Sequence, residues 1–276
     1  MPNDLSKTAI ARVLDPRIVE SLKERFNGDK KKKDAFYSAI LNMVKTNAKI
    51  AECDVNSILT AAANCAQLGL LPISGLDHAY FVPFNHKVQL IIGYKGYMEL
   101  ARRSGSIKAI NVEIIYENDE FHYEGGLSPL LRHIPYWLRK PPLDETGEIY
   151  GAYVIAEFSD GTRQADVFSI AEIVKSKKAS KASDKSYSPW QTWPEEMIKK
   201  TAIRKAAKRW PMSILMARAT ELDTSNDLGR VQEADLSGII PSDHLPVEPI
   251  EVKATVVKSD EKQENMAASG EGESLI

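Results

Sequence analysis

An Asp-Gly pair between two strand-like runs is the strongest constraint on how this chain folds. Residues 148–158 and 162–168 bracket Asp160-Gly161, and such a pair between alternating runs is typical of a tight β-hairpin. A second hairpin is predicted over residues 79–92, around a Pro-Phe-Asn-His turn. Ile110, Val112 and Ile114 alternate with polar neighbours as in a further strand. The chain therefore contains antiparallel β-structure.

Helices are expected on both sides of these strands, over residues 15–26, 34–50, 54–69, 94–104 and 194–209. Asn27-Gly28 ends the first, and Asp54 and Gly69 suit the start and stop of the third. Ser169-Ile-Ala-Glu172 is a capping box that opens a further short helix. The lysine run 30–33 is interpreted as a solvated loop in preference to a contact site. Residues 117–148 are irregular and have room for an extra hairpin. This mixture predicts an α+β fold, with antiparallel hairpins packed against helices.

Charge is distributed unevenly along the chain. The formal net charge is −2, but residues 231–276 hold ten acidic and three basic side chains, which leaves residues 1–230 at +5. The acidic stretch is poor in aromatic residues and cannot bury enough surface to offset its conformational entropy, so residues 231–276 are predicted to be disordered. We expect an N-terminal helix and basic linker (1–33), a functional core (34–225) and an acidic tail (226–276).

Residues 175–209 form the most basic segment, with eleven Lys or Arg and three acids. A capping box at Thr192-Trp-Pro-Glu195 and Pro211 bound a helix within it. At about 100° per residue, Lys200, Arg204 and their basic neighbours project outward. Lys199 falls amid the apolar half. An ordinary surface helix balances its lysines with acids one turn away, but residues 201–209 contain none, which favours phosphate binding.

Two further clusters suit nucleic acid. The loop over residues 175–193 mixes lysines with aromatic residues, as in a platform for single strands; Trp193 is expected to anchor the helix in the core, while Trp190 fits a core role and a strand contact equally. The segment Gln89–Tyr97 ends a strand in Gly93 and enters a helix, so free N–H groups there suit an anion, although a tight turn is the usual reason for Gly-x-x-Gly.

Enzymatic functions find no support in the sequence. It lacks a phosphate-binding Gly-x-x-x-x-Gly-Lys-Ser/Thr loop, a Gly-x-Ser-x-Gly elbow and a His-Glu-x-x-His pair. The five histidines have no metal-like spacing, and Cys53 and Cys65 are interpreted as packing residues of a reduced compartment. No apolar run approaches the length of a membrane span. We expect a cytoplasmic binding protein without cofactor or metal.

Several motifs occur together in a fixed order: Cys65-Ala-Gln-Leu-Gly-Leu, His78-Ala-Tyr, Pro83-Phe, Gln89-Leu-Ile-Ile-Gly-Tyr-Lys-Gly-Tyr, Leu100-Ala-Arg-Arg-Ser-Gly, Asp119-Glu-Phe, Pro189-Trp and Glu196-Met-Ile-Lys-Lys-Thr-Ala-Ile-Arg. Through them, residues 34–225 closely resemble the RecT family of prophage single-strand annealing proteins. The resemblance implies ATP-independent binding of single-stranded DNA, annealing of complementary strands, and assembly into rings or helical filaments. It also implies partnership with a phage exonuclease, and the host single-strand binding protein is a further candidate partner.

The resemblance and the clusters together define the expected DNA-binding residues. By the resemblance, Lys199, Lys200 and Arg204 would hold phosphates, Lys95 and its turn would line the same groove, and Trp190 would lie near the strand. The full set is Lys87, Tyr94, Lys95, Tyr97, Arg102, Arg103, Lys178, Lys181, Trp190, Lys199, Lys200, Arg204, Lys205 and Lys208. The alternatives are a sequence-specific DNA-binding regulator, a phage nuclease, and an RNA-binding module built on Gly93-Tyr-Lys-Gly96.

Overall fold

The computed structural model describes residues 11–126, 129–141, 145–179, 188–211, 213–236 and 239. Its elements are α2 (Pro16–Arg25), α3 (Lys30–Thr46), α4 (Ala48–Ala51), α5 (Val55–Leu68), β1 (Ala79–Phe84), β2 (Lys87–Ile92), α6 (Tyr94–Arg103), β3 (Ile107–Tyr116), β4 (Glu120–Glu124), β5 (Leu130–Ile134), the 3-10 turn η1 (Tyr136–Leu138), β6 (Ile149–Phe158), β7 (Arg163–Ser169), α7 (Ile170–Ala179), α8 (Pro189–Thr192), α9 (Pro194–Ala207) and α10 (Ile214–Asp227). The predicted α+β class is confirmed.

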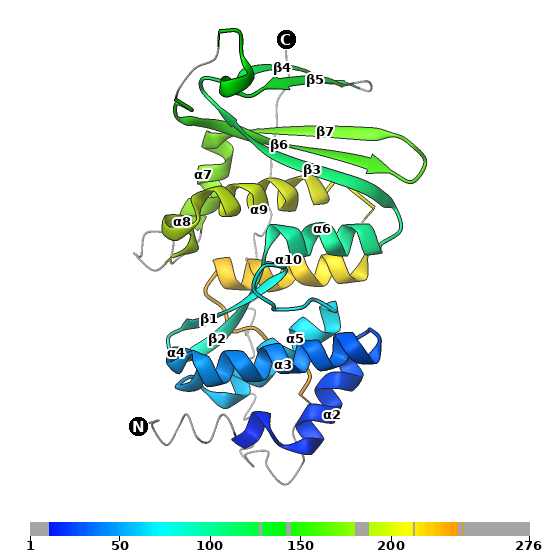
Figure 1. Ribbon diagram of the computed structural model, residues 1–276, viewed down its shortest axis with the longest axis vertical. Coiled ribbons are helices and arrows are strands. Elements are labelled where there is room, and N and C mark those ends of the chain that lie inside the picture. Colours follow the sequence, from blue (N-terminus) through cyan, green and yellow to red (C-terminus); the bar gives the residue numbers. More distant parts are fainter. Residues whose placement is uncertain are drawn as a thin grey trace, which may run out of the picture.

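A three-stranded antiparallel sheet forms the upper half of the molecule in Figure 1, with β6 between β3 and β7. The Asp160-Gly161 turn joins β6 to β7 as predicted: Asp160 accepts a 2.9 Å hydrogen bond from the Thr162 N–H, and Gly161 has a φ of +84°. The hairpin β4–β5 is the extra one expected in residues 117–148, and it lies beyond the sheet (Figure 1).

The expected capping box at the start of α7 forms. Ser169 Oγ accepts the Glu172 N–H, and Glu172 accepts the Ser169 N–H. These reciprocal bonds satisfy backbone donors that the first turn of a helix leaves free. The local sequence is therefore sufficient to fix this strand-to-helix junction.

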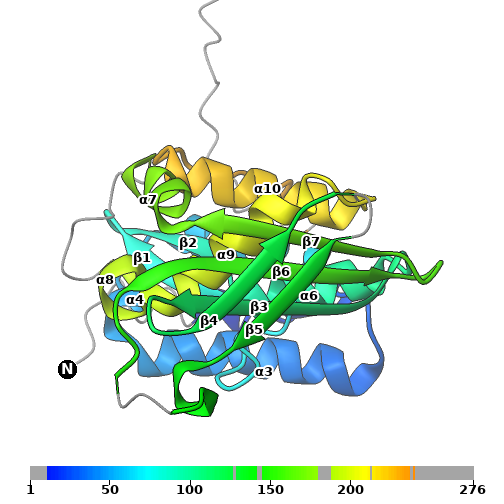
Figure 2. The same cartoon turned by 90° about the horizontal axis from the view of Figure 1, so that it is seen from above.

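Helix α9 lies in the middle of the molecule. It packs against β3 and β6 on one side and against α6 on the other, and α10 in turn contacts α6 and β2. The hairpin β1–β2 packs on α5, below which lie α2 and α3 (Figure 1). Seen from above, the strands cross over these helices (Figure 2). A single hydrophobic core runs through both halves, so α9 and α10 are held from several sides.

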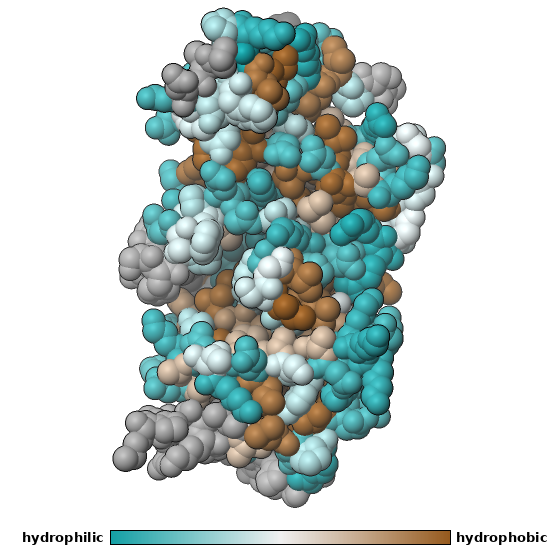
Figure 3. Space-filling view, in the orientation of Figure 1, coloured by the Kyte–Doolittle hydropathy of each residue, from teal (hydrophilic) through white to brown (hydrophobic). Residues whose placement is uncertain are grey.

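Figure 3 shows hydrophobic residues reaching this face of the molecule near the top and again at mid-height, between hydrophilic ones. Among the described residues, the large apolar side chains that are more than half exposed are Leu130, Trp137, Leu138, Tyr150, Trp193, Ile214 and Val231. Exposure of a single large apolar side chain is common in soluble proteins. Its significance therefore depends on what surrounds it.

The N-terminal lysine run is helical, so its interpretation as a loop is wrong. Asp29 accepts a 2.8 Å hydrogen bond from the Lys32 N–H and caps α3, which begins at Lys30. An N-cap carboxylate stabilises a helix start even where the following side chains are cationic. The helix expected over 34–50 thus starts earlier and breaks at Asn47, whose side chain caps α4.

The ordered body extends past the predicted start of the tail, because residue 226 falls inside α10. Gln232 is buried, and its amide both donates to the Leu90 carbonyl and accepts from the Leu90 N–H, each at 2.8 Å. The Glu233 carbonyl accepts from the side chains of Asn64 and Arg218. Residues 231–236 are therefore packed on the body and are not disordered. The rest of the acidic tail, beyond Ile239, lies outside the described residues.

Candidate nucleic-acid interface

A proline-bounded elbow presents a tryptophan at the surface. Pro189 opens α8 and Pro194 opens α9, and Trp193 between them has φ −137° and ψ 61°, with its N–H bonded to the Pro189 carbonyl at 2.8 Å. Its side chain is 65% exposed, whereas Trp190 is 7% exposed. Prolines fix φ at the start of both helices, so the elbow is stiff. The core role expected for Trp193 is wrong, and of the two roles left open for Trp190 the structure gives it that of the core anchor.

The burial of Trp190 and the exposure of Trp193 have a local cause. Ser188 caps α8 by accepting the Trp190 N–H, and the Thr192 hydroxyl donates back to the Ser188 carbonyl at 3.2 Å. The predicted Thr192 capping box therefore does not form, and α9 starts without a side-chain cap. Because a short extra helix occupies residues 189–192, Trp190 turns inward and Trp193 turns out.

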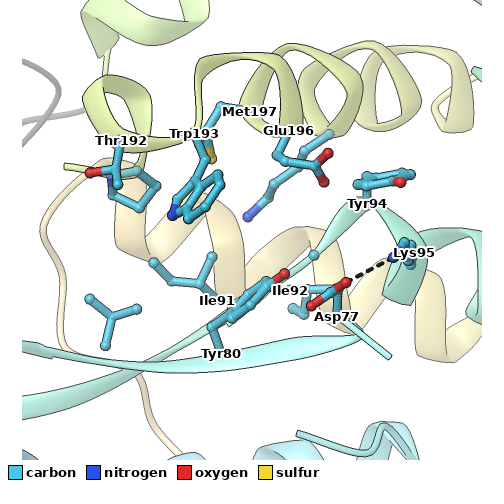
Figure 4. A pocket seen from close by; sticks show the side chains of 14 residues that line it. Asp77, Tyr80, Ile91, Ile92, Tyr94, Lys95, Thr192, Trp193, Glu196 and Met197 are labelled. Atoms are coloured by element: carbon cyan, nitrogen blue, oxygen red, sulfur yellow. Dashed lines mark hydrogen bonds and ion pairs between the residues drawn. The ribbon is translucent and has the colours of Figure 1, made fainter. Parts of the chain in front are cut away.

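A cleft of about 630 Å³ separates this elbow from the β1–β2 hairpin and the start of α6. In Figure 4, Trp193 lies above Tyr80, which rises from β1, and Tyr94 lies beside them at the start of α6. Tyr80 is 43% exposed and Tyr94 is half-buried. Apolar side chains of Val82, Ile91 and Met197 line the walls between the rings. The cleft thus offers three aromatic faces, of which only Tyr94 belongs to the predicted set.

Two lysines lie near the Tyr94 ring, and one of them, Lys95, itself lines the cleft. Lys199 Nζ lies 5.7 Å from the centre of the Tyr94 ring, and Lys95 Nζ lies 5.9 Å from it. Such contacts stabilise an ammonium over an aromatic face. Lys199 projects from the apolar half of α9, and the Tyr94 ring is the partner of its charge there. Lys95 also forms an ion pair with Asp77, at 2.8 Å. Tyr94, Lys95 and Lys199 are therefore brought together as predicted.

Carboxylates share the cleft with these cations. Asp77 and Glu196 both line it. The hydrogen bond from Lys95 lowers the pKa of Asp77 and raises that of Lys95. Burial and the charge of Asp77 together raise the pKa of the Tyr80 hydroxyl. Lys95 and Asp77 are therefore both charged, and Tyr80 is neutral, near neutral pH.

Gly93 and Gly96 serve close backbone packing. A Cβ on Gly93 would lie 2.1 Å from the Asp77 carbonyl oxygen, and one on Gly96 would lie 2.1 Å from that of His78. The Gly93 N–H donates to the His78 carbonyl at 3.0 Å. The Gly93 N–H is therefore not available to an anion, although no side chain caps the start of α6.

The basic face predicted for α9 is largely turned inward. Lys200 is 5% exposed, and its Nζ lies 2.9 Å from the Asp223 carboxylate. Arg204 pairs with Asp227 at 2.8 Å. Asp223 and Asp227 of α10 are four residues apart, as are Lys200 and Arg204. They therefore neutralise the two cations that no acid within α9 balances. This matched spacing is the sequence signal from which the pairing of α9 with α10 could have been predicted.

Tyr97 belongs to this buried cluster and is fully buried. Its hydroxyl donates to Asp223 at 2.6 Å, and burial together with that carboxylate raises its pKa well above the ordinary value. Burial lowers the pKa of Lys200, and the attraction of Asp223 opposes that shift. Tyr97, Lys200 and Arg204 therefore join α6, α9 and α10. The expectation that Tyr97 faces a strand is wrong, whereas Lys200, although paired with Asp223, is one of the residues that line the cleft.

The remaining predicted residues lie apart from the cleft lining. Lys205 lies 3.6 Å from Glu172, and both Arg102 and Arg103 pair with Glu99. Arg209, also placed on the outward face, pairs with the buried Asp166. Of the predicted lysines, Lys87, Lys178 and Lys208 are exposed. Lys181 lies outside the described residues.

Comparison with known proteins places these features in a family. The family model described as "RecT family" matches residues 34–235, and E. coli (strain K12) Protein RecT is 39% identical over 196 residues, covering 68% of this chain and 70% of that protein. The chain belongs to the RecT family. The uncharacterized protein YqaK of Bacillus subtilis (strain 168) is 29% identical over 216 residues, or 77% of this chain and 72% of that protein. The RecT resemblance is confirmed, and the match includes the packed residues after 225.

The described residues of this RecT-family chain lack two kinds of feature. None of their helices is both long and apolar enough to cross a bilayer. Among the same residues, no group of three or more His, Cys, Asp or Glu side chains is placed to hold a metal ion.

Proposed function

We propose that the cleft between the α8–α9 elbow and the β1–β2 hairpin holds single-stranded DNA, and that the protein anneals complementary strands without nucleoside triphosphate. RecT family membership supports single-strand annealing in recombination as the general function. The observation that carries the proposal for this site is the exposed Trp193 facing Tyr80, with Tyr94 and two lysines alongside.

The chemistry of these groups suits a strand without sequence preference. Every base has a π-face, and stacking on an aromatic side chain contributes about 1–3 kcal/mol per base. The ammonium groups of Lys95 and Lys199 attract phosphates and reduce the repulsion that a second strand would meet. Base pairing itself supplies the free energy of annealing, so the reaction needs no nucleotide hydrolysis.

The cleft residues are held by rigid surroundings. The Lys200–Asp223 and Arg204–Asp227 pairs fix α9 against α10, and the two prolines fix the elbow. Trp193 and Lys199 therefore keep their positions when no strand is bound. Preorganisation lowers the entropic cost of binding.

A matched pair of tryptophan variants tests the proposal. Trp193→Ala removes the ring from the cleft, whereas Trp137→Ala removes an equally exposed ring (58%) from η1, outside the cleft lining. We expect Trp193→Ala to weaken binding of unrelated single-stranded oligonucleotides by about 5- to 150-fold and to slow ATP-free annealing. Trp137→Ala should leave both unchanged.

Two outcomes would contradict the proposal. Equal affinity of Trp193→Ala and the wild type would show that the strand does not use this cleft. Wild-type protein that fails to accelerate annealing of complementary oligonucleotides without ATP would contradict the annealing function itself. Preference for one sequence among the oligonucleotides would instead indicate a DNA-binding regulator.

The proposal includes assembly and cellular setting. We infer rings or helical filaments in which clefts of successive subunits follow one strand, action in the cytoplasm, and cooperation with a phage exonuclease and the host single-strand binding protein. Electron microscopy after sequential addition of the two complementary strands tests the assembly. Particles that stay monomeric would contradict it.

A further inference from the structure

Asp77 occupies an unusual position for a carboxylate in a cleft proposed to bind DNA. Its side chain lines the cleft, and its carboxylate accepts a hydrogen bond from the Lys95 ammonium, with Nζ and Oδ2 2.8 Å apart (Figure 4). A carboxylate there repels a phosphate backbone and at the same time uses one of the two cations available to it. Simple optimisation for DNA affinity would not place an acid at this point.

The local backbone holds Asp77 in place. Its φ of +55° lies in the left-handed region, which non-glycine residues seldom adopt and which Asp and Asn tolerate best. Its carbonyl is packed on Gly93, where no side chain would fit, and the next carbonyl, of His78, is packed on Gly96 in the same way. The carboxylate is thus fixed at the cleft by backbone packing, with α6 directly behind it.

We propose that Asp77 acts as an internal competitor for the DNA phosphate. In the strand-free protein its carboxylate neutralises Lys95, and an entering phosphate has to displace it. Asp77 thereby lowers the affinity of this subsite and leaves the bound strand exchangeable. This inference rests on the proposed function of the cleft, and it assigns Asp77 as a positioning residue acting through Lys95.

The magnitude follows from the exposure of the pair. The side chains of Lys95 and Asp77 are 41% and 30% exposed, so the pair is partly screened by solvent and its loss releases little free energy. Removing the carboxylate charge also removes its repulsion of a nearby phosphate. Together these effects predict single-strand affinity about 2- to 10-fold higher at low salt. Lys95 becomes available to one further phosphate, which steepens the logarithmic salt dependence by about 0.7.

Asp77→Asn is the appropriate substitution, because Asn keeps the shape and tolerates the left-handed backbone. Asp34→Asn is the matched control: Asp34 forms a comparable surface pair with Lys23, at 2.6 Å, between α2 and α3 and away from the cleft. We expect tighter binding and a steeper salt dependence for Asp77→Asn, and neither change for Asp34→Asn. On a Lys95→Met background, Asp77→Asn should lose the added salt dependence.

The result that overturns the inference is unchanged or weaker binding by a folded Asp77→Asn protein. Weaker binding would mean that Asp77 orients Lys95 toward DNA instead of competing for it. These outcomes are distinguishable from failure of the proposed function: in that case the wild type shows no single-strand binding that depends on Trp193. A loss of structure in Asp77→Asn would be seen by circular dichroism, and Asp77→Gly, which adopts a left-handed backbone without strain, then supplies the uncharged variant.

Discussion

Breaking the buried pair between Lys200 and Asp223 should destabilise the protein strongly. The two side chains are 6% and 2% exposed, and the ammonium lies 2.9 Å from the carboxylate. In Lys200→Met the Asp223 carboxylate would stay buried with the Tyr97 hydroxyl as its hydrogen-bond donor. Removal of one partner from a buried pair costs about 3–5 kcal/mol, a large part of the roughly 5–15 kcal/mol that stabilises a typical domain.

Urea unfolding followed by circular dichroism measures this loss. Lys199→Met is the control, because Lys199 is only partly buried and forms no ion pair with a carboxylate of the described residues. The double variant Lys200→Met/Asp223→Leu removes both charges and should recover most of the lost stability, since an apolar replacement of a buried pair is often neutral or stabilising.

DNA binding by the double variant separates the two roles of Lys200. If the lysine serves packing alone, the folded double variant keeps the wild-type salt dependence of single-strand binding. A loss below about 1 kcal/mol in Lys200→Met, joined to a salt dependence shallower by about 0.7, would refute the structural argument. That result would support the contact between Lys200 and a DNA phosphate that the sequence predicted.

Three further outcomes follow from the packing. Gly96→Ala should destabilise the protein by about 1–3 kcal/mol in thermal unfolding, because its Cβ would meet the His78 carbonyl at 2.1 Å; Gly125→Ala, with its nearest neighbour at 3.4 Å, should cost less. A chain ending at residue 230 should unfold at lower urea than one ending at 240, because loss of Gln232 leaves the buried N–H and carbonyl of Leu90 without their 2.8 Å partners; equal midpoints would contradict this. Burial raises the pKa of the Cys65 thiol, which reduces the reactive thiolate at neutral pH, so this thiol should react with Ellman's reagent only after denaturation.

Local sequence signals predicted most of the secondary structure. The Asp160-Gly161 hairpin, the Ser169–Glu172 capping box and the helix from Asp54 to Gly69 all form, because each depends on side chains that satisfy neighbouring backbone groups. The prediction of a loop at the lysine run was wrong for the same kind of reason. The single N-cap at Asp29 stabilises the helix start more than the repulsion among the four lysines destabilises it.

The candidate site was only partly predictable. Tyr94, Lys95 and Lys199 were identified and do meet. Tyr80 and Trp193 were missed, because one sits in an ordinary strand pattern and the other beside a helix start, where an aromatic side chain is usually buried. Helical projection separates two faces of α9 but does not say which face another helix covers.

By itself, the sequence determined the α+β class, most of the helices, the hairpin turns and the RecT family, since all of these depend on residues close together in the chain or on motifs in order. Tertiary structure alone decided what the basic helix does. Lys200 and Arg204 turn inward because α10 brings Asp223 and Asp227 against them, and burial of a charge requires such a partner. Lys199, one residue from Lys200, lies instead over the Tyr94 ring, and Trp193, at the start of the same helix, lines the cleft.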